Sequence, residues 1–249
     1  MAKFAHDEIV PFKESELAKK DQVADMFNNI AYRYDFLNRF LSVGIDVGWR
    51  KTAIKELRSI APKKILDVAT GTADVALLTE QLLKPTEIVG IDISDGMLGF
   101  GREKIKAKGL ENTITLLNGD SENIRFNNDY FDAITVAFGV RNFQDLSKGL
   151  KEMHRVLKPG GKVVILEFSK PSSIGFKQLY QFYMNYITPS IGKLFSKNKD
   201  AYQYLNDSVQ AFPEGAQFLN ILNDAGFTQT YLKKLSFGIC TIYLSLIHI

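Results

Sequence analysis

Residues 65–74 read ILDVATGTAD, an apolar run that contains one acid, turns at Gly71 and continues as a helical pattern. Downstream of this stretch, short apolar runs alternate with longer helical patterns, which is typical of βα units around a parallel sheet. We expect strands at residues 64–68, 87–92, 113–118, 131–137 and 162–168, and helices at residues 73–83, 96–107 and 146–157. The sequence therefore predicts an α/β fold with a doubly wound, mostly parallel sheet.

The chain has 249 residues, of which 45% are hydrophobic, so it is long enough to bury a core of its own. We expect a single domain over residues 1–249. Met26, Ile30 and Tyr34 recur at helical spacing, which predicts an N-terminal helical cap over residues 1–62.

Two segments in the C-terminal third stand apart from the βα rhythm. Residues 174–212 begin with aromatic side chains interspersed with lysines and predict an aromatic helical insertion, with core packing of an amphipathic helix as the alternative. One permitted back-translation of residues 244–249 matches a transposase end used in preparing sequencing libraries, so we expect a sequencing artefact there. The alternative is that these residues extend an apolar edge strand.

Composition and charge exclude several classes of protein. The net charge is +3, and no basic stripe with interleaved aromatics extends beyond the insertion, which disfavours nucleic acid as a partner. The single cysteine excludes an internal disulfide, and the three histidines lack metal-ligand spacing, so we expect no metal. No signal peptide or membrane span is apparent. We expect a cytoplasmic protein, and a peripheral contact at the inner face of the cytoplasmic membrane stays open.

Acidic side chains at the expected strand ends point to a ligand. In a doubly wound sheet, ligands bind at the carboxyl edge of the strands. Gly71 allows a close backbone approach, Asp67 is placed to receive an ammonium group, and Asp92 is placed to accept hydrogen bonds from two ribose hydroxyls. Asp120 ends the third strand, where it suits an adenine amino group, with Met97 packing on the ring.

The nature of that ligand follows from the turn. A dinucleotide site needs the pattern G-x-G-x-x-G, so that a helix N-terminus can hold a pyrophosphate. Here the pattern is ATGTAD, and the carboxylate of Asp74 would repel a pyrophosphate. A cationic sulfonium ligand tolerates acids, which favours S-adenosylmethionine over NAD. An ordinary tight turn is the alternative for the glycine segment taken alone.

Several longer strings then carry a resemblance over nearly the whole chain. They are residues 34–38 (YDFLN), residues 138–142 (FGVRN), residues 155–161 (RVLKPGG) and residues 167–171 (EFSKP). With these strings the chain resembles the class I methyltransferases, and within them the ubiquinone/menaquinone biosynthesis C-methyltransferase family. The resemblance implies a seven-stranded sheet and S-adenosylmethionine as cofactor, with contacts at Thr72, Asp92, Asp120 and Ser121.

The chain departs from the family pattern at four positions. Leu37 replaces a methionine and is close to it in size. Asp46 replaces a histidine, and a carboxylate cannot perform every role of an imidazole. Ala73 stands where a glycine is more common, and Ala137 stands where a serine is often found.

The resemblance also implies the reaction, which is methylation of a ring carbon of a prenylated demethylquinol. Among such quinols, demethylmenaquinol is the substrate that we expect. Carbon attack needs an ionised ring hydroxyl, and a phenol has a pKa of about 10, so the site must favour the anion. We expect Arg141 to act as a fixed cation, Asn142 to orient the hydroxyl or a water, and Asp46 to accept a proton. The expected substrate contacts are Tyr34, Phe138, Tyr180 and Tyr183.

Alternative functions remain at this stage. One is a methyltransferase acting on another small hydrophobic acceptor. Another is a non-catalytic S-adenosylmethionine-binding assembly partner for membrane enzymes. Without the resemblance, Arg141 would be interpreted as a surface salt bridge and Asn142 as a helix cap. The sequence does not distinguish a naphthoquinol from a benzoquinol, and a homodimer is left open.

Overall fold

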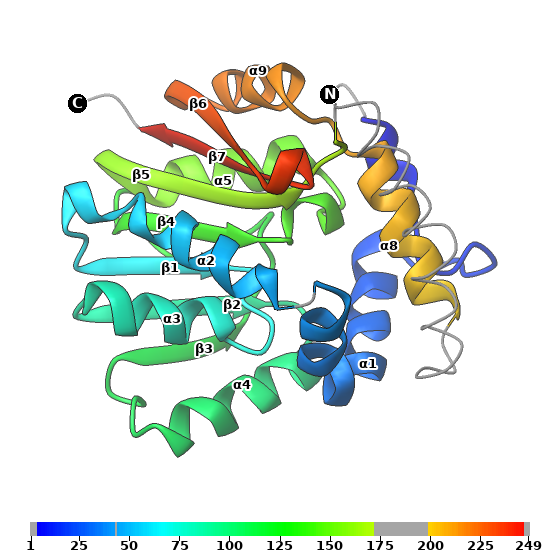
Figure 1. Ribbon diagram of the computed structural model, residues 1–249, viewed down its shortest axis with the longest axis horizontal. Helices are drawn as coiled ribbons and strands as arrows, with labels where there is room; N and C mark the ends of the chain where they lie inside the picture. Colours follow the sequence, from blue (N-terminus) through cyan, green and yellow to red (C-terminus); the bar gives the residue numbers. More distant parts are fainter. Residues whose placement is uncertain (1–3, 43, 172–198, 247–249) are drawn as a thin grey trace.

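The structure is a computed structural model that describes residues 4–42, 44–171 and 199–246. Within it, seven strands form one sheet in the order β3-β2-β1-β4-β5-β7-β6 (Figure 1). The strands are β1 (Lys64–Val68), β2 (Glu87–Asp92), β3 (Ile114–Asn118), β4 (Phe131–Ala137), β5 (Leu157–Phe168), β6 (Thr228–Leu235) and β7 (Cys240–Leu246). The first five strands pair in parallel, and β7 pairs antiparallel with both β5 and β6.

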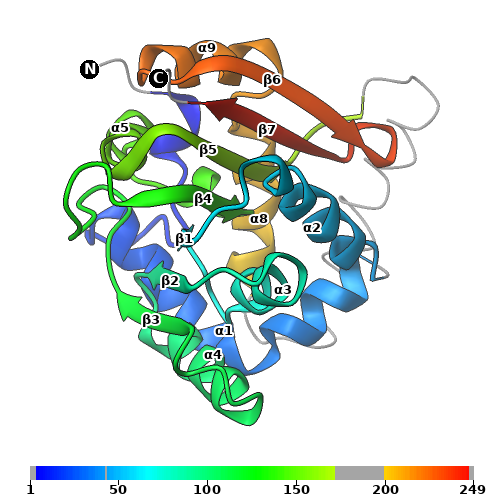
Figure 2. The same cartoon turned by 90° about the vertical axis from the view of Figure 1, so that its left-hand side faces the viewer.

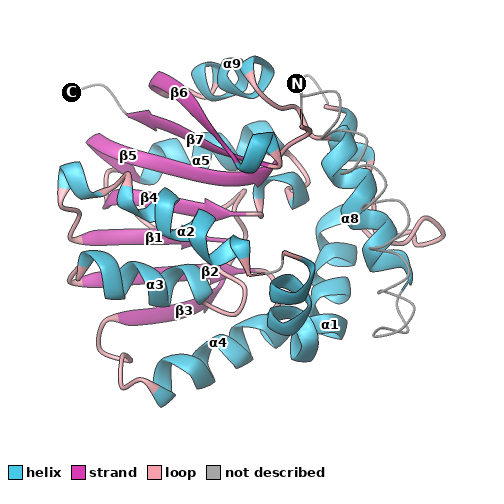
Figure 3. Ribbon diagram, viewed as in Figure 1, coloured by secondary structure: helices cyan, strands magenta, loops and turns pink. Residues whose placement is uncertain are grey.

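Helices cover both faces of this sheet, as Figures 1 and 3 show. They are α2 (Ile45–Lys55), α3 (Asp74–Leu83) and α4 (Asp95–Ala107) on one face, and α5 (Leu146–Val156) and α9 (Ala216–Asp224) on the other. A β-strand points successive side chains to opposite faces, and β1, β2, β4 and β5 contribute apolar side chains to the core on both faces: Ile65 packs beneath the first set of helices and Leu66 beneath the second. The result is the three-layer, doubly wound architecture that the sequence predicts.

Two further helices cross the edge of the sheet at which the parallel strands end. They are α1 (Lys19–Leu41) and α8 (Lys199–Ala211), which Figures 1 and 2 place together at that edge. Val23 and Met26 of α1 form a separate small core with Ala201 and Tyr204 of α8. This packing places both helices over the carboxyl ends of β1, β2 and β4, where the sequence predicts the site.

The expected N-terminal cap over residues 1–62 is divided in the structure. Only α1 crosses the sheet edge, because Trp49 and Ala53 of α2 pack on the face of the sheet beside α3 and join its core. Residues 45–55 therefore belong to a covering layer. Among the described residues, none of the helices combines the length and the hydropathy that crossing a membrane requires.

The strand boundaries follow the sequence closely, with two differences. The ranges 64–68, 87–92 and 131–137 are reproduced, whereas β3 begins at Ile114 instead of residue 113 and β5 begins at Leu157 instead of residue 162. Residues 158–161 form an excursion within β5, since Phe131 pairs with Leu157 but Ala133 pairs with Lys162. The segment KPGG (residues 158–161) therefore lies within β5, close after the end of α5, and shifts the pairing of β5 with β4. Residues 244–246 complete β7, which lies inside the sheet and not at its edge.

Candidate functional site

The turn after β1 is held against the end of β2. Gly71 has a φ of +56°, a backbone conformation that favours glycine, and a Cβ there would lie 3.3 Å from the Cε of Met97 and press on it. Its N–H donates to Oδ2 of Asp92 at 2.8 Å, and the N–H of Ser94 donates to Oδ1 of the same carboxylate at 2.9 Å. Burial nevertheless raises the pKa of Asp92. Each of its oxygens keeps a second lone pair for another donor.

Asp67 lies beneath this turn. It is 1% exposed, and its carboxylate accepts from the hydroxyls of Thr70 at 2.6 Å and Thr135 at 2.7 Å. Desolvation by burial raises its pKa to about 6, although both hydrogen bonds oppose that change. Asp67 therefore fixes the turn from below. Its expected contact with a ligand ammonium group, directly or through water, stays a prediction.

A pocket of about 660 Å³, partly open to solvent, extends from this turn across the carboxyl ends of β2, β3 and β4. Among the residues expected at the site, eight line it: Tyr34, Gly71, Asp92, Met97, Asp120, Ser121, Phe138 and Asn142. Tyr180 and Tyr183 lie outside the described residues. Residues that sequence analysis did not assign also line the pocket, including Lys20, Phe27 and Gln144.

Asp120 is engaged by the helix that crosses the sheet edge. Nζ of Lys20 on α1 donates to Oδ2 of Asp120 at 3.0 Å, and the N–H of Glu122 donates to Oδ1 at 2.8 Å. The pair is partly exposed, and the carboxylate raises the pKa of Lys20. Lys20 was missed because helical spacing says which face of α1 is apolar but not which strand end that face meets.

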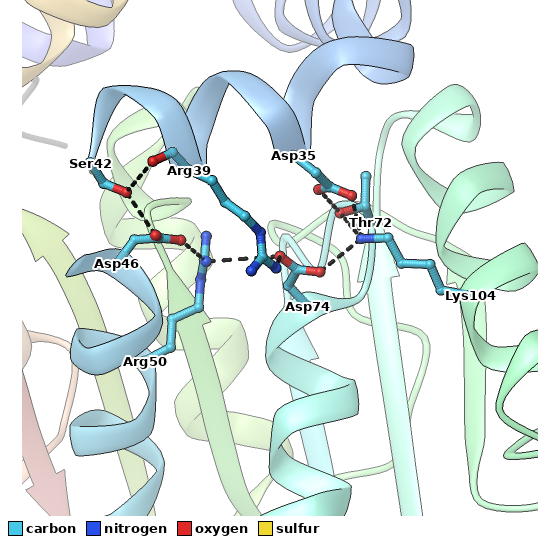
Figure 4. Close-up of polar contacts among 8 residues, drawn as sticks. All are labelled: Asp35, Arg39, Ser42, Asp46, Arg50, Thr72, Asp74 and Lys104. Carbon is cyan, nitrogen blue, oxygen red and sulfur yellow. Dashed lines mark hydrogen bonds and ion pairs between the residues drawn. The ribbon is translucent and has the colours of Figure 1, made fainter. Parts of the chain in front are cut away.

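Thr72 does not line the pocket, and its hydroxyl faces a polar network outside it. The hydroxyl donates to Oδ1 of Asp35 on α1 at 2.6 Å and accepts from Nζ of Lys104 on α4 at 3.0 Å. Lys104 also pairs with Asp35 and Asp74, as Figure 4 shows. The expected contact of Thr72 with the cofactor stays a prediction. In the structure, its side chain ties α1 and α4 to the glycine turn.

The same network contains Asp46 (Figure 4). Asp46 is buried, forms an ion pair with Arg50 one turn later on α2, and accepts from the hydroxyl of Ser42 at 2.7 Å. Arg50 lies 3.8 Å from Asp74 in turn. Both carboxylate oxygens of Asp46 therefore have partners, and the residue does not line the pocket. Its expected role as a proton acceptor stays a prediction.

The loop after β4 forms the other side of the pocket. Phe138 has a φ of +59° and stacks on Phe168 with ring centroids 4.5 Å apart. Its carbonyl accepts from Nη1 of Arg141 at 2.6 Å. The same nitrogen donates to Oε1 of Glu167 on β5 at 2.7 Å. Arg141 is 6% exposed and Glu167 is fully buried, so this arginine forms a buried ion pair and does not line the pocket.

That ion pair has unsatisfied atoms. Nε of Arg141 and Oε2 of Glu167 have no hydrogen-bond partner among the described residues. Burial raises the pKa of Glu167, and the adjacent guanidinium opposes this change. Glu167 was missed as a site residue although residues 167–171 carry part of the resemblance, since its partner cannot be deduced from the string itself.

Asn142 follows Arg141 and does line the pocket. Its Oδ1 accepts from the hydroxyl of Tyr204 on α8 at 3.1 Å, and its Nδ2 lies 3.4 Å from the carbonyl oxygen of Phe138. Tyr204 falls within the expected insertion, but it was not singled out because its partner is 62 residues away.

The arrangement suits a cationic ligand that carries a nucleoside. Asp92 and Asp120 offer carboxylate oxygens along one wall, Gly71 admits a close approach, and Met97 supplies an apolar surface. Phe138 and Asn142 face the same space from the β4 side, where a second molecule would meet the first. In the part of the chain that the structure describes, no group of three or more histidine, cysteine, aspartate or glutamate side chains is placed to hold a metal ion.

Comparison with known proteins identifies relatives over nearly the full length. The model of the ubiE/COQ5 methyltransferase family matches residues 15–246. The chain is 46% identical over 240 residues to a demethylmenaquinone methyltransferase of Bacteroides fragilis, covering 96% of this chain and 98% of the relative. It is 48% identical over 233 residues to a ubiquinone/menaquinone biosynthesis C-methyltransferase of Geotalea daltonii, covering 93% and 98%.

Solved structures share the fold at low identity. A putative S-adenosyl-L-methionine-dependent methyltransferase from Methanococcus maripaludis has a TM-score of 0.64 at 18% identity, over 94% of this chain and 97% of the other. A [4+2]-cyclase has a TM-score of 0.68 at 15% identity, over 92% and 96%. Since the second is named for a different reaction, the fold alone does not decide the chemistry.

Proposed function

The chain belongs to the ubiE/COQ5 methyltransferase family. From this premise we propose that it transfers the methyl group of S-adenosylmethionine to a ring carbon of a prenylated demethylquinol. The substrate that we propose is demethylmenaquinol. The product is then menaquinol. The observation that carries the proposal is the pocket itself, in which acids at the ends of β2 and β3 face Phe138 and Asn142 on the β4 side.

The cofactor supplies an electrophilic methyl group on a sulfonium centre. The residues of the pocket wall at the ends of β2 and β3 fit this cofactor. Asp92 has lone pairs for the ribose hydroxyls, and Met97 is buried where it can pack on the adenine. Asp120 is placed for the adenine amino group if Lys20 moves away from it. The carboxylates along this wall also favour a positively charged ligand over a pyrophosphate.

On the β4 side, the chain must stabilise a phenolate. A phenol has an ordinary pKa of about 10, so a donor or a cation near its oxygen favours the anion. Asn142 has an amide group on the pocket wall, whereas Arg141 is buried and does not line the pocket. Because Arg141 is paired with Glu167, its field on the pocket is weakened, and the directional contact belongs to Asn142.

The isoprenoid tail and the membrane belong to the same proposal. We infer that the tail is held by the aromatic helical insertion over residues 174–212, with Tyr180 and Tyr183 as contacts. We also infer that the protein acts in the cytoplasm and makes transient contact with the membrane surface. The apolar isoprenoid chain of the acceptor supports both inferences, since moving each methylene group out of water contributes about 0.8 kcal/mol of favourable free energy.

Two measurements test the proposed function. The purified protein, given S-adenosylmethionine and reduced demethylmenaquinol in detergent micelles, should form menaquinol and S-adenosylhomocysteine in equal amounts. A cell that lacks the gene should accumulate demethylmenaquinone in a mass-spectrometric quinone profile. Methylation of another hydrophobic acceptor, with no turnover of the quinol and a normal profile, would replace the proposed substrate. Binding of the cofactor without turnover of any acceptor would favour an assembly partner.

A further inference from the structure

The β4 side of the pocket offers one amide that can be oriented in two ways. Asn142 reaches the pocket, whereas Arg141 beside it is turned toward Glu167 and the carbonyl of Phe138. An asparagine side chain has an acceptor on one side and a two-proton donor on the other. Which side faces the ligand decides whether the residue stabilises an anion or repels it.

The neighbours of Asn142 settle this orientation. Oδ1 lies 3.1 Å from the hydroxyl oxygen of Tyr204, and Nδ2 lies 3.4 Å from the carbonyl oxygen of Phe138. If the amide were reversed, its oxygen would face that carbonyl, and two acceptors would meet without a proton between them. The contact with the Phe138 carbonyl uses one N–H of Nδ2. Among the described residues, the second N–H has no protein acceptor.

Tyr204 is suited to hold this arrangement. It is 3% exposed and packs with Val23 and Met26 of α1, so its ring cannot easily change position. Burial, the main cause, raises the pKa of its hydroxyl, which therefore stays protonated and able to donate. It is not among the residues that line the pocket, so any effect on the ligand passes through Asn142.

We propose that Tyr204 is a positioning residue that holds the amide of Asn142 with an N–H available to the ionised oxygen of the methyl acceptor. The inference rests on the proposed function for the identity of that acceptor. The proposal also gives α8 a part in the reaction, because this helix supplies the Tyr204 hydroxyl that orients the side chain of Asn142 in the loop after β4.

The test compares Tyr204→Phe with a matched control. The control is Tyr243→Phe, which also removes a buried tyrosine hydroxyl that holds a hydrogen bond, in this case from the N–H of Gly215 at 2.9 Å. Rates with S-adenosylmethionine and reduced demethylmenaquinol are measured against pH for both variants, for Asn142→Ala and for the double variant Tyr204→Phe with Asn142→Ala.

We expect Asn142→Ala to lower kcat by about 10-fold or more, as loss of a hydrogen bond to an anion does, and Tyr204→Phe by about 2- to 10-fold. The KM for S-adenosylmethionine stays unchanged in both. Tyr204→Phe moves the acidic limb of the kcat profile to higher pH, because the bound phenol is harder to ionise. Tyr243→Phe leaves kcat and the profile unchanged. The double variant is no slower than Asn142→Ala alone, since Tyr204 acts only through Asn142.

Losses that multiply in the double variant, or a Tyr204→Phe profile identical to that of Tyr243→Phe, overturn the proposal. If the wild type does not methylate the quinol, the proposed function fails, and the orientation is read by nuclear magnetic resonance instead. The side-chain amide signals of Asn142, assigned by their loss in Asn142→Ala, should shift in Tyr204→Phe and not in Tyr243→Phe. Unshifted signals in Tyr204→Phe overturn the positioning role independently of the substrate.

Discussion

The two sides of the pocket use charged residues in opposite ways. On the side of β2 and β3, Asp92 and Asp120 are partly exposed on the pocket wall, and Asp120 pairs with Lys20 where solvent can reach it. On the side of β4, Arg141 and Glu167 are withdrawn into the core as a buried pair. Charges that remain on the wall are available to a ligand, whereas charges in the core shape the loop that carries the ligand contacts. The difference separates residues that bind from residues that support.

The largest effect is expected from breaking the buried pair. Arg141→Met leaves Glu167 buried without a cation, and removing one partner of such a pair costs about 3–5 kcal/mol of folding free energy. Urea unfolding of the variant and of Arg141→Met with Glu167→Met checks this expectation. The double variant should regain most of the stability, because an apolar replacement leaves no charge buried. Equal stability of wild type and Arg141→Met would show that the pair does not support the loop.

Arg141→Lys separates support from catalysis. The ammonium keeps the charge but loses the planar geometry that lets one guanidinium contact both Glu167 and the carbonyl of Phe138. We expect kcat to fall more than the KM for S-adenosylmethionine rises, because the loop that carries Asn142 shifts while the opposite wall does not. A rise confined to KM would mean that Arg141 acts on the cofactor.

These differences explain what could be predicted from sequence. The ends of β1, β2 and β3 are fixed by apolar runs and by the rule that parallel strands end at one edge, so the sequence suffices to bring Gly71, Asp92 and Asp120 together, and in the structure all three line one pocket. The partners of Arg141 and Asn142 come from β5 and α8, and no local pattern encodes such contacts. β6 and β7 were not located either, although β6 alternates between exposed and half-buried positions.

On the pocket wall, the acid at the end of β2 should matter for binding and not for folding. Asp92→Ala removes an acceptor for the ribose hydroxyls, and hydrogen bonds to a charged group are worth about 1.5–3 kcal/mol, so affinity for S-adenosylmethionine should fall by roughly 10- to 150-fold. Calorimetry measures this loss. Asp92→Asn is the matched variant, because its amide oxygen can still accept from the N–H of Gly71. Unchanged affinity in a folded Asp92→Ala protein would refute the ribose assignment.

The acid beneath the wall should affect the pH dependence of stability. Burial raises the pKa of Asp67 from 3.8 to about 6, so the folded protein binds a proton between those values that the unfolded chain releases. Stability from this group therefore rises as pH falls through 6, by about 1 kcal/mol between pH 7 and pH 5. Urea midpoints of Asp67→Asn should lack this increment relative to the wild type. Parallel pH profiles of the two proteins would contradict the raised pKa.

The smallest effect is expected from the exposed pair on the wall. Lys20 and Asp120 are 41% and 28% exposed at their side chains, and ion pairs of this kind contribute about 0–1 kcal/mol. Lys20→Met should therefore leave the unfolding free energy nearly unchanged, in contrast to Arg141→Met.

If Asp120 binds the adenine amino group, Lys20 competes for the same carboxylate, and the Lys20→Met variant should bind S-adenosylmethionine up to about 5-fold more tightly. This gain should be greatest at low salt, because added salt already weakens an exposed pair. Calorimetric titrations at two salt concentrations, with Asp120→Asn alongside, provide the measurement. Weaker binding in Lys20→Met would instead make the lysine a ligand contact, and the wall would then use a cation as well as its acids.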